Sequence, residues 1–376
     1  MAKIQEIDKN FKVNCDLPED VVFYDCLCEP IELKGLYYEN GVFSRMPQDY
    51  EAKTDNEGVK FLMYNTSGGR IKFATNSPYV AIAVEISEFT VWPHMPHTAH
   101  SGVDLYSCER GKKDYYYIKT FMPPIAENSD NTKYAGFVDL EIFDDFKERE
   151  ILINFPLYNG VKAFKIGIKS GCELYSPVSY KYEKPVYFYG SSITQGGCAS
   201  RPGNSYMAHL SRWLDFDFVN LGFSGSARGE SEMAEYIANK DMSVFVLDYD
   251  ANAPTNEHLE KTHYPFYKKI REANKDLPII MLSFPKHRKR PAKANPGDEF
   301  TKCYIKSDLT IRETYERAIK EGDKNVYYID GSKVFGEKDQ DACTVDNCHP
   351  NDLGFYRMAE AIYPVLKDIL DKKQTF

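Results

Sequence analysis

The spacing of apolar residues changes after Tyr182-Glu183-Lys184-Pro185, and this change constrains the fold more than any other feature of the sequence. Beyond it, short apolar runs alternate with longer amphipathic stretches, which is typical of βαβ units and a parallel sheet. Strands are expected at residues 186–189, 216–220, 244–247, 279–282 and 326–329. Helices are expected at 205–214, 257–273, 308–320 and after Leu353. The second half of the chain is therefore predicted to be a three-layer α/β domain.

The first half of the chain carries strand signals and almost no helical period. Residues 80–86 alternate with period two, as a β-strand does. Apolar runs at 151–155 and 161–168 flank Asn159-Gly160, and this dipeptide between two such runs predicts a β-hairpin. Further strand candidates lie near 115–118 and 137–140. An antiparallel β-sandwich is predicted for residues 1–180, and the length of 376 residues also favours two domains.

Charge and composition argue against several classes of protein. The 47 basic residues are outnumbered by 56 acidic ones, so no overall positive field draws in nucleic acid. Charges interrupt the apolar stretches of the amino terminus, and no segment reaches the roughly 18 apolar residues that span a bilayer. The nine cysteines lack a second pair at zinc-binding spacing, which indicates free thiols in a reducing compartment. A cytoplasmic protein without a nucleic-acid or membrane partner is expected, with a homo-oligomer left open.

Polar residues that suit acyl transfer follow the strands of the second half. In open α/β sheets, ligands bind beyond the carboxyl ends of the strands. Ser192 follows the first strand on a sharp turn, and Asp346 and His349 follow the last strand. Ser192 would attack a carbonyl, His349 would take the hydroxyl proton, and Asp346 would orient the imidazole. These residues are the predicted catalytic triad.

Three N–H donors at the same edge are candidates for an oxyanion hole. The backbone N–H groups of Ser192 and Gly225 follow the first and second strands, and the Asn252 amide follows the third. One such donor is typically worth about 2.7–4 kcal/mol in the transition state. Two simpler roles stay open: Gly225 as a turn residue, and Asn252 as a helix cap or a partner of loop carbonyls.

The blocks GSSIT, NLGFSG, DANA and DNCH, in this order and at strand ends, resemble those of the SGNH, or GDSL-like, hydrolases. The resemblance implies a flavodoxin-like parallel sheet. The positions that match the functional residues of the family are Ser192, Gly225, Asn252, Asp346 and His349. Two blocks depart from the family pattern. The usual GDS reads GSS, which leaves Ser191 and Ser192 as adjacent candidates with the block position favouring Ser192, and the asparagine block lacks its preceding glycine.

The first half also resembles a known domain. Its GVDLY, residues 102–106, matches the GxDLY signature of a jelly-roll-like β-sandwich that accompanies SGNH domains in carbohydrate-active esterases. Residues 1–180 are therefore interpreted as an accessory domain and 181–376 as the catalytic domain. The resemblance implies a serine carboxylic ester hydrolase that removes O-acetyl or other short acyl groups from carbohydrate, without a metal or organic cofactor. Alternatives are a lipid or thioester acylhydrolase with the same triad and a catalytically silent carbohydrate-binding protein.

Other polar residues are weaker candidates. Arg201 follows the nucleophile and could contact substrate or form a salt bridge. Trp92 lies in a loop that could line the cleft. In the same loop, His94, His97 and His100 have no acidic or cysteine companion, so no metal site is expected.

Two further features are interpreted as structural. Glu260 and His263 repeat the carboxylate–histidine spacing of the triad, but they are expected on a solvated helix face. Residues 286–308 are expected to form a long polar loop, which in a compact domain is either disordered or functional.

Overall fold

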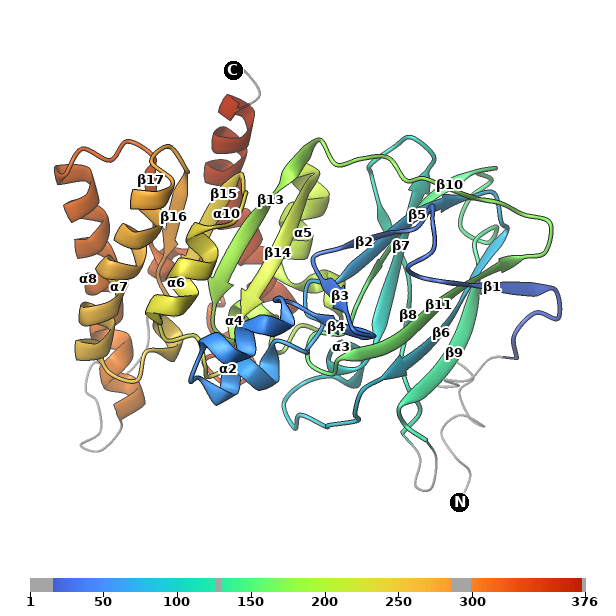
Figure 1. Cartoon of the computed structure of the whole chain (residues 1–376), viewed down its shortest axis with the longest axis horizontal. Coiled ribbons are helices and arrows are strands. Elements are labelled where there is room, and N and C mark those ends of the chain that lie inside the picture. The colour runs from blue at the N-terminus through green and yellow to red at the C-terminus, as the bar shows by residue number, and fades with distance from the viewer. Residues whose placement is uncertain (1–15, 126–129, 286–298, 374–376) are drawn as a thin grey trace. The chain divides into compact units, whose positions relative to one another are not determined.

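The computed structural model describes residues 16–125, 130–285 and 299–373, and contacts divide the chain into two compact units (Figure 1). The first unit comprises Met1–Ser44, Asn65–Ser179 and Arg201–Gly203. The second comprises Arg45–Tyr64, Tyr180–Ser200 and Asn204–Phe376. Residues 45–64, which a division at residue 180 would place in the first half, therefore make their contacts within the second unit.

Two antiparallel sheets form the first unit. One has the strand order β1 (Val21–Asp25), β11 (Val161–Lys169), β6 (Tyr79–Ile86) and β9 (Lys133–Asp139). The other has the order β12 (Leu174–Tyr175), β5 (Arg70–Thr75), β10 (Arg149–Asn154), β7 (Val103–Glu109) and β8 (Tyr116–Phe121), with β2 (Glu32–Lys34) paired to β5. Buried side chains of both sheets share one core cluster, which includes Ile71, Ile82, Leu105 and Phe164. The predicted β-sandwich is confirmed.

The hairpin predicted around Asn159-Gly160 is wrong. The strand before it, β10, pairs with β5 and β7, whereas the strand after it, β11, pairs with β1 and β6 in the other sheet. Asn159 is buried, and its side chain donates hydrogen bonds to the Thr90 carbonyl (3.0 Å) and to Ser101 Oγ (2.7 Å). The dipeptide thus fixes a crossover between sheets, which the tolerance of Asn-Gly for turns does not reveal.

Two short helical elements lie between the early strands. The chain passes from β3 (Tyr37–Glu39) and β4 (Val42–Ser44) into the 3-10 helix η2 (Gln48–Lys53) and then α2 (Glu57–Leu62). Asn56 caps α2 by accepting a hydrogen bond from the N–H of Val59 (3.2 Å). Neither helix was predicted, because elements of six residues are too short to show a helical period.

Five parallel strands form the sheet of the second unit. Their order is β14 (Phe216–Gly222), β13 (Tyr182–Gly190), β15 (Val244–Asp248), β16 (Ile279–Leu282) and β17 (Val326–Ile329). All five predicted strands are confirmed, two of them with the expected bounds. Every residue of β15 and β16 is buried, as a strand covered by helices on both faces should be.

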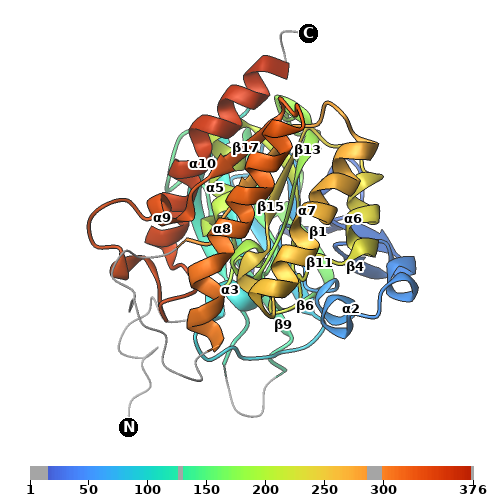
Figure 2. The ribbon, with the colours of Figure 1, turned by 90° about the vertical axis from the view of Figure 1, so that its left-hand side faces the viewer.

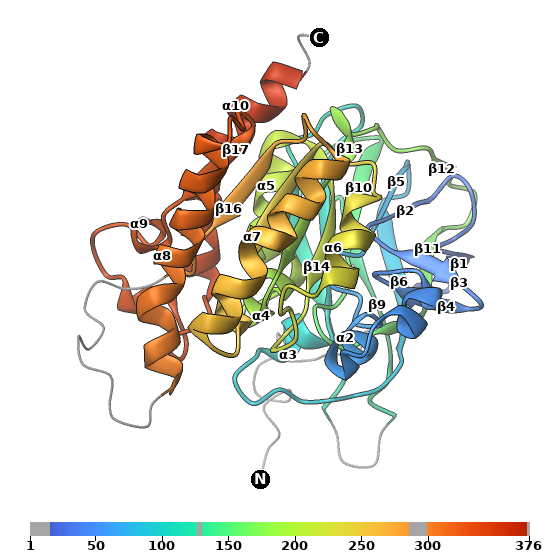
Figure 3. The same cartoon turned by 60° about the vertical axis from the view of Figure 1, so that its left-hand side comes forward.

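Helices cover both faces of this sheet (Figures 2 and 3). On one face α6 (Ser231–Ala238), α7 (Asn256–Ala273) and α8 (Glu299–Lys320) lie side by side and share a core cluster with the sheet. On the other face α5 (Tyr206–Leu214) contacts α10 (Asp352–Lys373), and Tyr206 packs against Phe188 of β13 at 5.7 Å between ring centroids. Shorter elements connect these layers: α3 (His97–His100) in the first unit, and α4 (Ser192–Gln195), η3 (Pro202–Asn204), η4 (Asp250–Asn252), α9 (Gly331–Val334) and η5 (Asp341–Cys343) at the loops. The three-layer prediction is confirmed.

Several details of the second half differ from the predictions. Helix α6 was not predicted. Helix α8 begins at Glu299, inside the stretch expected to be a polar loop, and residues 286–298 of that stretch lie outside the described residues. His263 is fully buried, with Nδ1 3.0 Å from Thr314 Oγ1. The expected solvated face is therefore right for Glu260, which is exposed, and wrong for His263. The spacing of Glu260 and His263 along α7 does not reveal that Thr314 of α8 packs against His263.

The remaining predictions about the fold concern the cysteines and the length and apolarity of the helices. The seven cysteines whose side chains the structure describes are free thiols, as predicted. Within the described ranges, every helix falls short of the length or the apolarity that crossing a lipid bilayer requires.

Candidate active site

The turn after β13 places two serines in different roles. Gly190 ends the strand, and a Cβ there would lie 2.1 Å from Thr194 Oγ1 and 2.3 Å from the Asp248 carbonyl, so only glycine fits. Ser191 caps α4, because its hydroxyl accepts a hydrogen bond from the Ile193 N–H (3.2 Å). Ser192 is the first residue of α4, and its hydroxyl contacts His349 in the loop before α10. The structure thus distinguishes the two adjacent candidates.

The hydroxyl of Ser192 meets the imidazole of His349. The distance from Ser192 Oγ to His349 Nε2 is 2.9 Å, across 157 residues of sequence. On the other side of the ring, Nδ1 of His349 lies 2.7 Å from Oδ2 of Asp346. The three residues predicted as a triad therefore form one continuous chain of hydrogen bonds, in which an N–H at Nδ1 leaves Nε2 to accept the serine proton.

The carboxylate of Asp346 also holds the backbone around His349. Its Oδ1 accepts hydrogen bonds from the backbone N–H groups of His349 (2.7 Å) and Cys348 (3.0 Å). Partial burial alone would raise the pKa of Asp346, but the hydrogen bonds from the side chain and backbone of His349 outweigh it, and the pKa lies below its ordinary value. An ionised carboxylate can hold the imidazole in one orientation and stabilise its charged form.

The oxyanion candidates follow three neighbouring strands. Gly190 at the end of β13 is paired with Gly222 of β14 and with Asp248 of β15, so these three strand ends lie together. Gly225 has a φ of +66° and open space around its Cβ direction, a conformation that glycine adopts without strain. Within the described part of the chain, the backbone N–H groups of Ser192 and Gly225 have no hydrogen-bond acceptor. Both are therefore available to a ligand.

The side chain of Asn252 lies at the same edge, in η4 after β15. Its amide nitrogen donates a hydrogen bond to the Phe223 carbonyl (2.8 Å), which links the loop after β15 to the loop that carries Gly225. An amide NH₂ group has a second N–H, which can serve as an oxyanion donor. The alternative role of Asn252 as a partner of a loop carbonyl is thus real, and it is compatible with the predicted one.

Sequence reasoning missed a buried carboxyl group next to α4, the helix that begins with the predicted nucleophile. Asp248 ends β15, and its Oδ2 accepts hydrogen bonds from Thr194 Oγ1 (3.0 Å) and the Tyr206 hydroxyl (3.3 Å). Burial raises the pKa of Asp248 well above its ordinary value, and the nearby charge of Asp250 adds to this effect. Thr194 belongs to α4, so Asp248 helps to hold the helix that begins with Ser192. Its place at the end of a buried strand was the signal available in the sequence.

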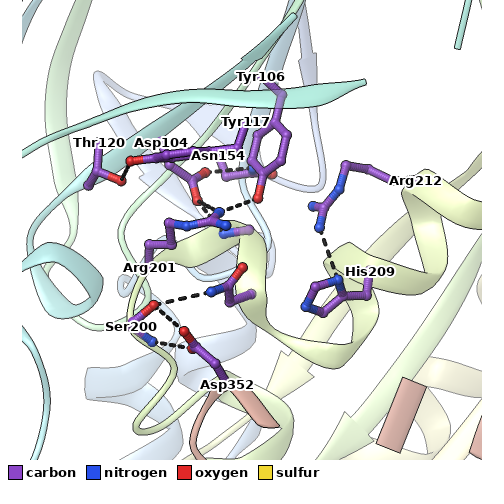
Figure 4. A network of polar contacts seen from close by, with 12 residues as sticks. Asp104, Tyr106, Tyr117, Thr120, Asn154, Ser200, Arg201, His209, Arg212 and Asp352 are labelled. Carbon is purple, nitrogen blue, oxygen red and sulfur yellow. Dashed lines mark hydrogen bonds and ion pairs between the residues drawn. The ribbon is translucent and has the colours of Figure 1, made fainter. Parts of the chain in front are cut away.

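The Arg201 side chain is held within the first unit (Figure 4). Its guanidinium lies 3.4 Å from the Asp104 carboxylate, donates to the Tyr106 hydroxyl, and stacks over the Tyr117 ring at 4.0 Å. The N–H of Gly203 also donates to Asp104, at 2.7 Å. Of its two predicted roles, a salt bridge is what the structure shows, and Asp104 and Tyr106 of the GxDLY motif supply it.

The loop that carries Trp92, His97 and His100 makes contacts within the first unit. Trp92 packs against Tyr158 with ring centroids 5.0 Å apart. His97 Nε2 lies 2.6 Å from the Pro123 carbonyl, and His100 Nδ1 lies 2.6 Å from Ser101 Oγ. These hydrogen bonds give both imidazoles a structural role. The role of Trp92 in substrate binding stays a prediction.

Two family models match the chain, one in each half. The model of the GDSL-like lipase/acylhydrolase family matches residues 183–367, and the GxDLY model, which describes the N-terminus of SGNH-hydrolase-type esterases, matches residues 21–174. The chain belongs to the GDSL-like SGNH hydrolases. This membership supports an ester hydrolase. No curated protein matches this SGNH hydrolase.

Solved structures share the fold over nearly the whole chain. A Bacteroides ovatus protein described as a GDSL-like lipase is 29% identical with a TM-score of 0.80, covering 93% of this chain and 98% of its own. A salicylyl-acyltransferase from a tetracycline biosynthetic pathway is 19% identical with a TM-score of 0.70, over 94% and 98%. An acetyl xylan esterase from Butyrivibrio proteoclasticus is 12% identical with a TM-score of 0.55, over 93% and 99%.

Proposed function

We propose that this SGNH hydrolase is a serine esterase that removes O-acetyl groups from carbohydrate. The observation that carries the reaction type is the chain from Ser192 Oγ through His349 to Asp346, with links of 2.9 Å and 2.7 Å. Such a chain delivers the hydroxyl proton to a base that is already oriented. The protein groups that act in the proposed steps are side chains and backbone N–H groups, and water is the second reactant.

In the first half-reaction, Ser192 Oγ attacks the acetyl carbonyl carbon and its proton passes to Nε2 of His349. The tetrahedral intermediate collapses as the bond from the carbonyl carbon to the sugar oxygen breaks. His349 returns its proton to that oxygen, which leaves as a free hydroxyl. The products of this step are the deacetylated sugar and an acetyl ester on Ser192.

In the second half-reaction, water attacks the acetyl ester and gives one proton to His349. The bond from the carbonyl carbon to Ser192 Oγ then breaks, Oγ regains the proton, and acetic acid leaves and ionises to acetate in water. Negative charge forms on the carbonyl oxygen in both steps. The N–H groups of Ser192 and Gly225 and the Asn252 amide would bind this oxygen, since they follow adjacent strand ends.

The substrate class rests on different grounds from the reaction. The GxDLY unit resembles the accessory domains of carbohydrate-active esterases, and an acetyl xylan esterase shares the fold. At 12% identity that likeness concerns the fold alone. An acylated carbohydrate is therefore proposed as the partner, and the acetyl group as the one removed.

Acetate release from acetylated xylan, acetylated mannan and a bacterial glycan tests the proposal. The wild type should release acetate and Ser192→Ala should not. Release that persists in the variant would exclude Ser192 as the nucleophile. Faster hydrolysis of octanoyl than of acetyl p-nitrophenyl esters would favour a lipid or thioester acylhydrolase instead. No labelling by a fluorophosphonate, with glycan affinity retained, would favour a silent carbohydrate-binding protein.

A further inference from the structure

Residues 45–64, here called the brace segment, are part of the second unit although they precede most of the sandwich in sequence. The N–H of Arg45 donates to the Met63 carbonyl (2.8 Å), so the two ends of the segment meet. Its apolar residues join the core of the second unit, and Tyr50 packs edge-on against Tyr236 of α6 at 5.3 Å. Figure 1 shows α2 of this segment, in blue, beside the arrowheads of β13 and β14.

Arg45 is a fully buried cation within the brace segment. Its guanidinium donates to the carbonyls of Gly222 and Leu62 and lies over the Phe223 ring, 4.5 Å from the centroid. Nη1 also lies 3.5 Å from the Asn220 carbonyl. Burying a charge is costly unless its donors are satisfied, and the planar fork of arginine can bind several carbonyls at once. Arg45 therefore joins the brace segment to the carboxyl end of β14.

A second set of contacts reaches the loop that follows β14. This stretch, residues 223–230, is called the oxyanion loop because it carries Gly225. The Asn56 amide donates to the Ser226 carbonyl (2.8 Å) and to the Glu230 carboxylate. A Cβ at Gly58 would lie 2.0 Å from Ser226 Oγ, so the backbone of α2 approaches the loop closely. Contacts with the brace segment therefore lie on either side of Gly225 in sequence.

The same loop supplies the partner of the third predicted donor. The Phe223 carbonyl accepts the hydrogen bond of Asn252, and the Phe223 N–H donates to the Gly190 carbonyl (2.8 Å). The residue that Arg45 stacks on is therefore also the residue that links β13, β14 and the loop after β15. A shift of the brace segment would move two oxyanion candidates together.

We propose that Arg45 and Asn56 are positioning residues, which fix the oxyanion loop so that its N–H donors meet the acyl oxygen. This inference rests on the proposed esterase function, since it assigns a role within that site. Neither side chain touches the reacting atoms in this arrangement. Their effect is on the placement of donors, and misplacement by about 1 Å can cost on the order of 10²-fold in rate. The catalytic unit is then incomplete without residues 45–64.

The test compares Arg45→Met, Arg45→Lys and Asn56→Ser in the full chain. Serine keeps the cap of α2 but is too short to reach the oxyanion loop. The measurements are kcat and KM for p-nitrophenyl acetate and the rate at which a fluorophosphonate labels Ser192. Hydrogen exchange over residues 223–230 reports on the loop without using activity. Asp49→Asn is the matched control, because Asp49 lies in the brace segment and forms an exposed ion pair with Lys53.

Arg45→Met should lower kcat about 10²-fold and the labelling rate by a similar factor, with KM within about twofold. Arg45→Lys should recover part of the rate, and Asn56→Ser should lose about tenfold with faster exchange of the loop. If Arg45→Met does not fold, Asn56→Ser decides the question. Folded variants with wild-type kcat and loop exchange would overturn the positioning role. A wild type that neither hydrolyses esters nor labels would instead overturn the esterase function.

Discussion

The Asp352 carboxylate accepts a 2.7 Å hydrogen bond from the backbone N–H of Ser200. It also accepts a hydrogen bond from the Ser200 hydroxyl. Asp352 begins α10 shortly after His349, and Ser200 lies in the loop between α4 and η3. One carboxylate thus joins the segment that carries the predicted nucleophile to the segment that carries its base. Figure 4 shows this link.

Asp352→Ala should therefore lower kcat by about 10-fold to 10²-fold, because the Ser192 and His349 segments lose a fixed spacing. Unfolding free energy should fall by only about 1 kcal/mol, from the lost charge at the helix start. Asp352→Asn keeps one hydrogen-bond acceptor, so its kcat should lie between those of the wild type and Asp352→Ala. Glu257→Gln, which removes an acid from the first turn of α7, is the control and should leave kcat unchanged. A parallel loss of kcat and stability in all three variants would contradict the prediction.

The two adjacent serines should respond oppositely to truncation. Ser192→Ala removes the hydroxyl that contacts His349 and should lower turnover by several orders of magnitude with the fold intact. Ser191→Ala removes only the cap of α4 and should cost about 1 kcal/mol of stability with a mild loss of rate. Ester hydrolysis and thermal unfolding of both variants check this. The reversed pattern of rates would reassign the nucleophile.

Much of the second unit could be predicted because its signals are local. Strands such as β16 are continuous apolar runs, and the polar blocks follow their carboxyl ends, so both the sheet and the triad candidates are visible in the sequence. Topology then brings Ser192 and His349 together although 157 residues separate them. The order of the polar blocks can be seen in the sequence. The 2.9 Å contact between Ser192 and His349 depends on the folded structure.

The missed features depend on partners far along the chain. Asn159-Gly160 has the local chemistry of a turn, but pairing of β10 and β11 with different partners decides its conformation. Arg45 looks like an ordinary surface residue until its carbonyl partners on β14 are known. Nothing in the spacing of α7 indicates that Thr314 faces His263.

The Asp104 side chain should matter to the first unit more than its polarity suggests. It is fully buried, and Oδ1 accepts from Asn154 (2.7 Å) while Oδ2 accepts from Gly203 and faces Arg201. Asp104→Ala should lower the unfolding free energy by about 3 kcal/mol, since these donors would be left unsatisfied. Gly203→Ala should also destabilise, because its Cβ would lie 2.4 Å from the Tyr106 hydroxyl. Denaturant unfolding measures both, and a loss below about 0.5 kcal/mol for Asp104→Ala would refute the prediction.

Acid should destabilise the second unit through His263. Burial lowers the pKa of this imidazole to about 3 in the folded protein, against an ordinary value of 6.5. Between these values the unfolded chain binds the proton and the folded chain does not, so the free energy of unfolding falls as the pH drops from about 6.5 towards 3. The loss approaches about 5 kcal/mol as an upper limit. Above pH 7 the residue should have no pH-dependent effect.

The variant His263→Gln isolates this contribution, since glutamine stays neutral and can still bond to Thr314. The chain has two tryptophans, Trp92 in the first unit and Trp213 in the second, so Trp92→Phe leaves emission that reports on the second unit. In that background, urea unfolding at pH 7.5 and pH 4.5 should give a smaller difference in free energy for His263→Gln than for His263. Equal pH dependence in the two proteins would mean that the buried imidazole accepts a proton without unfolding.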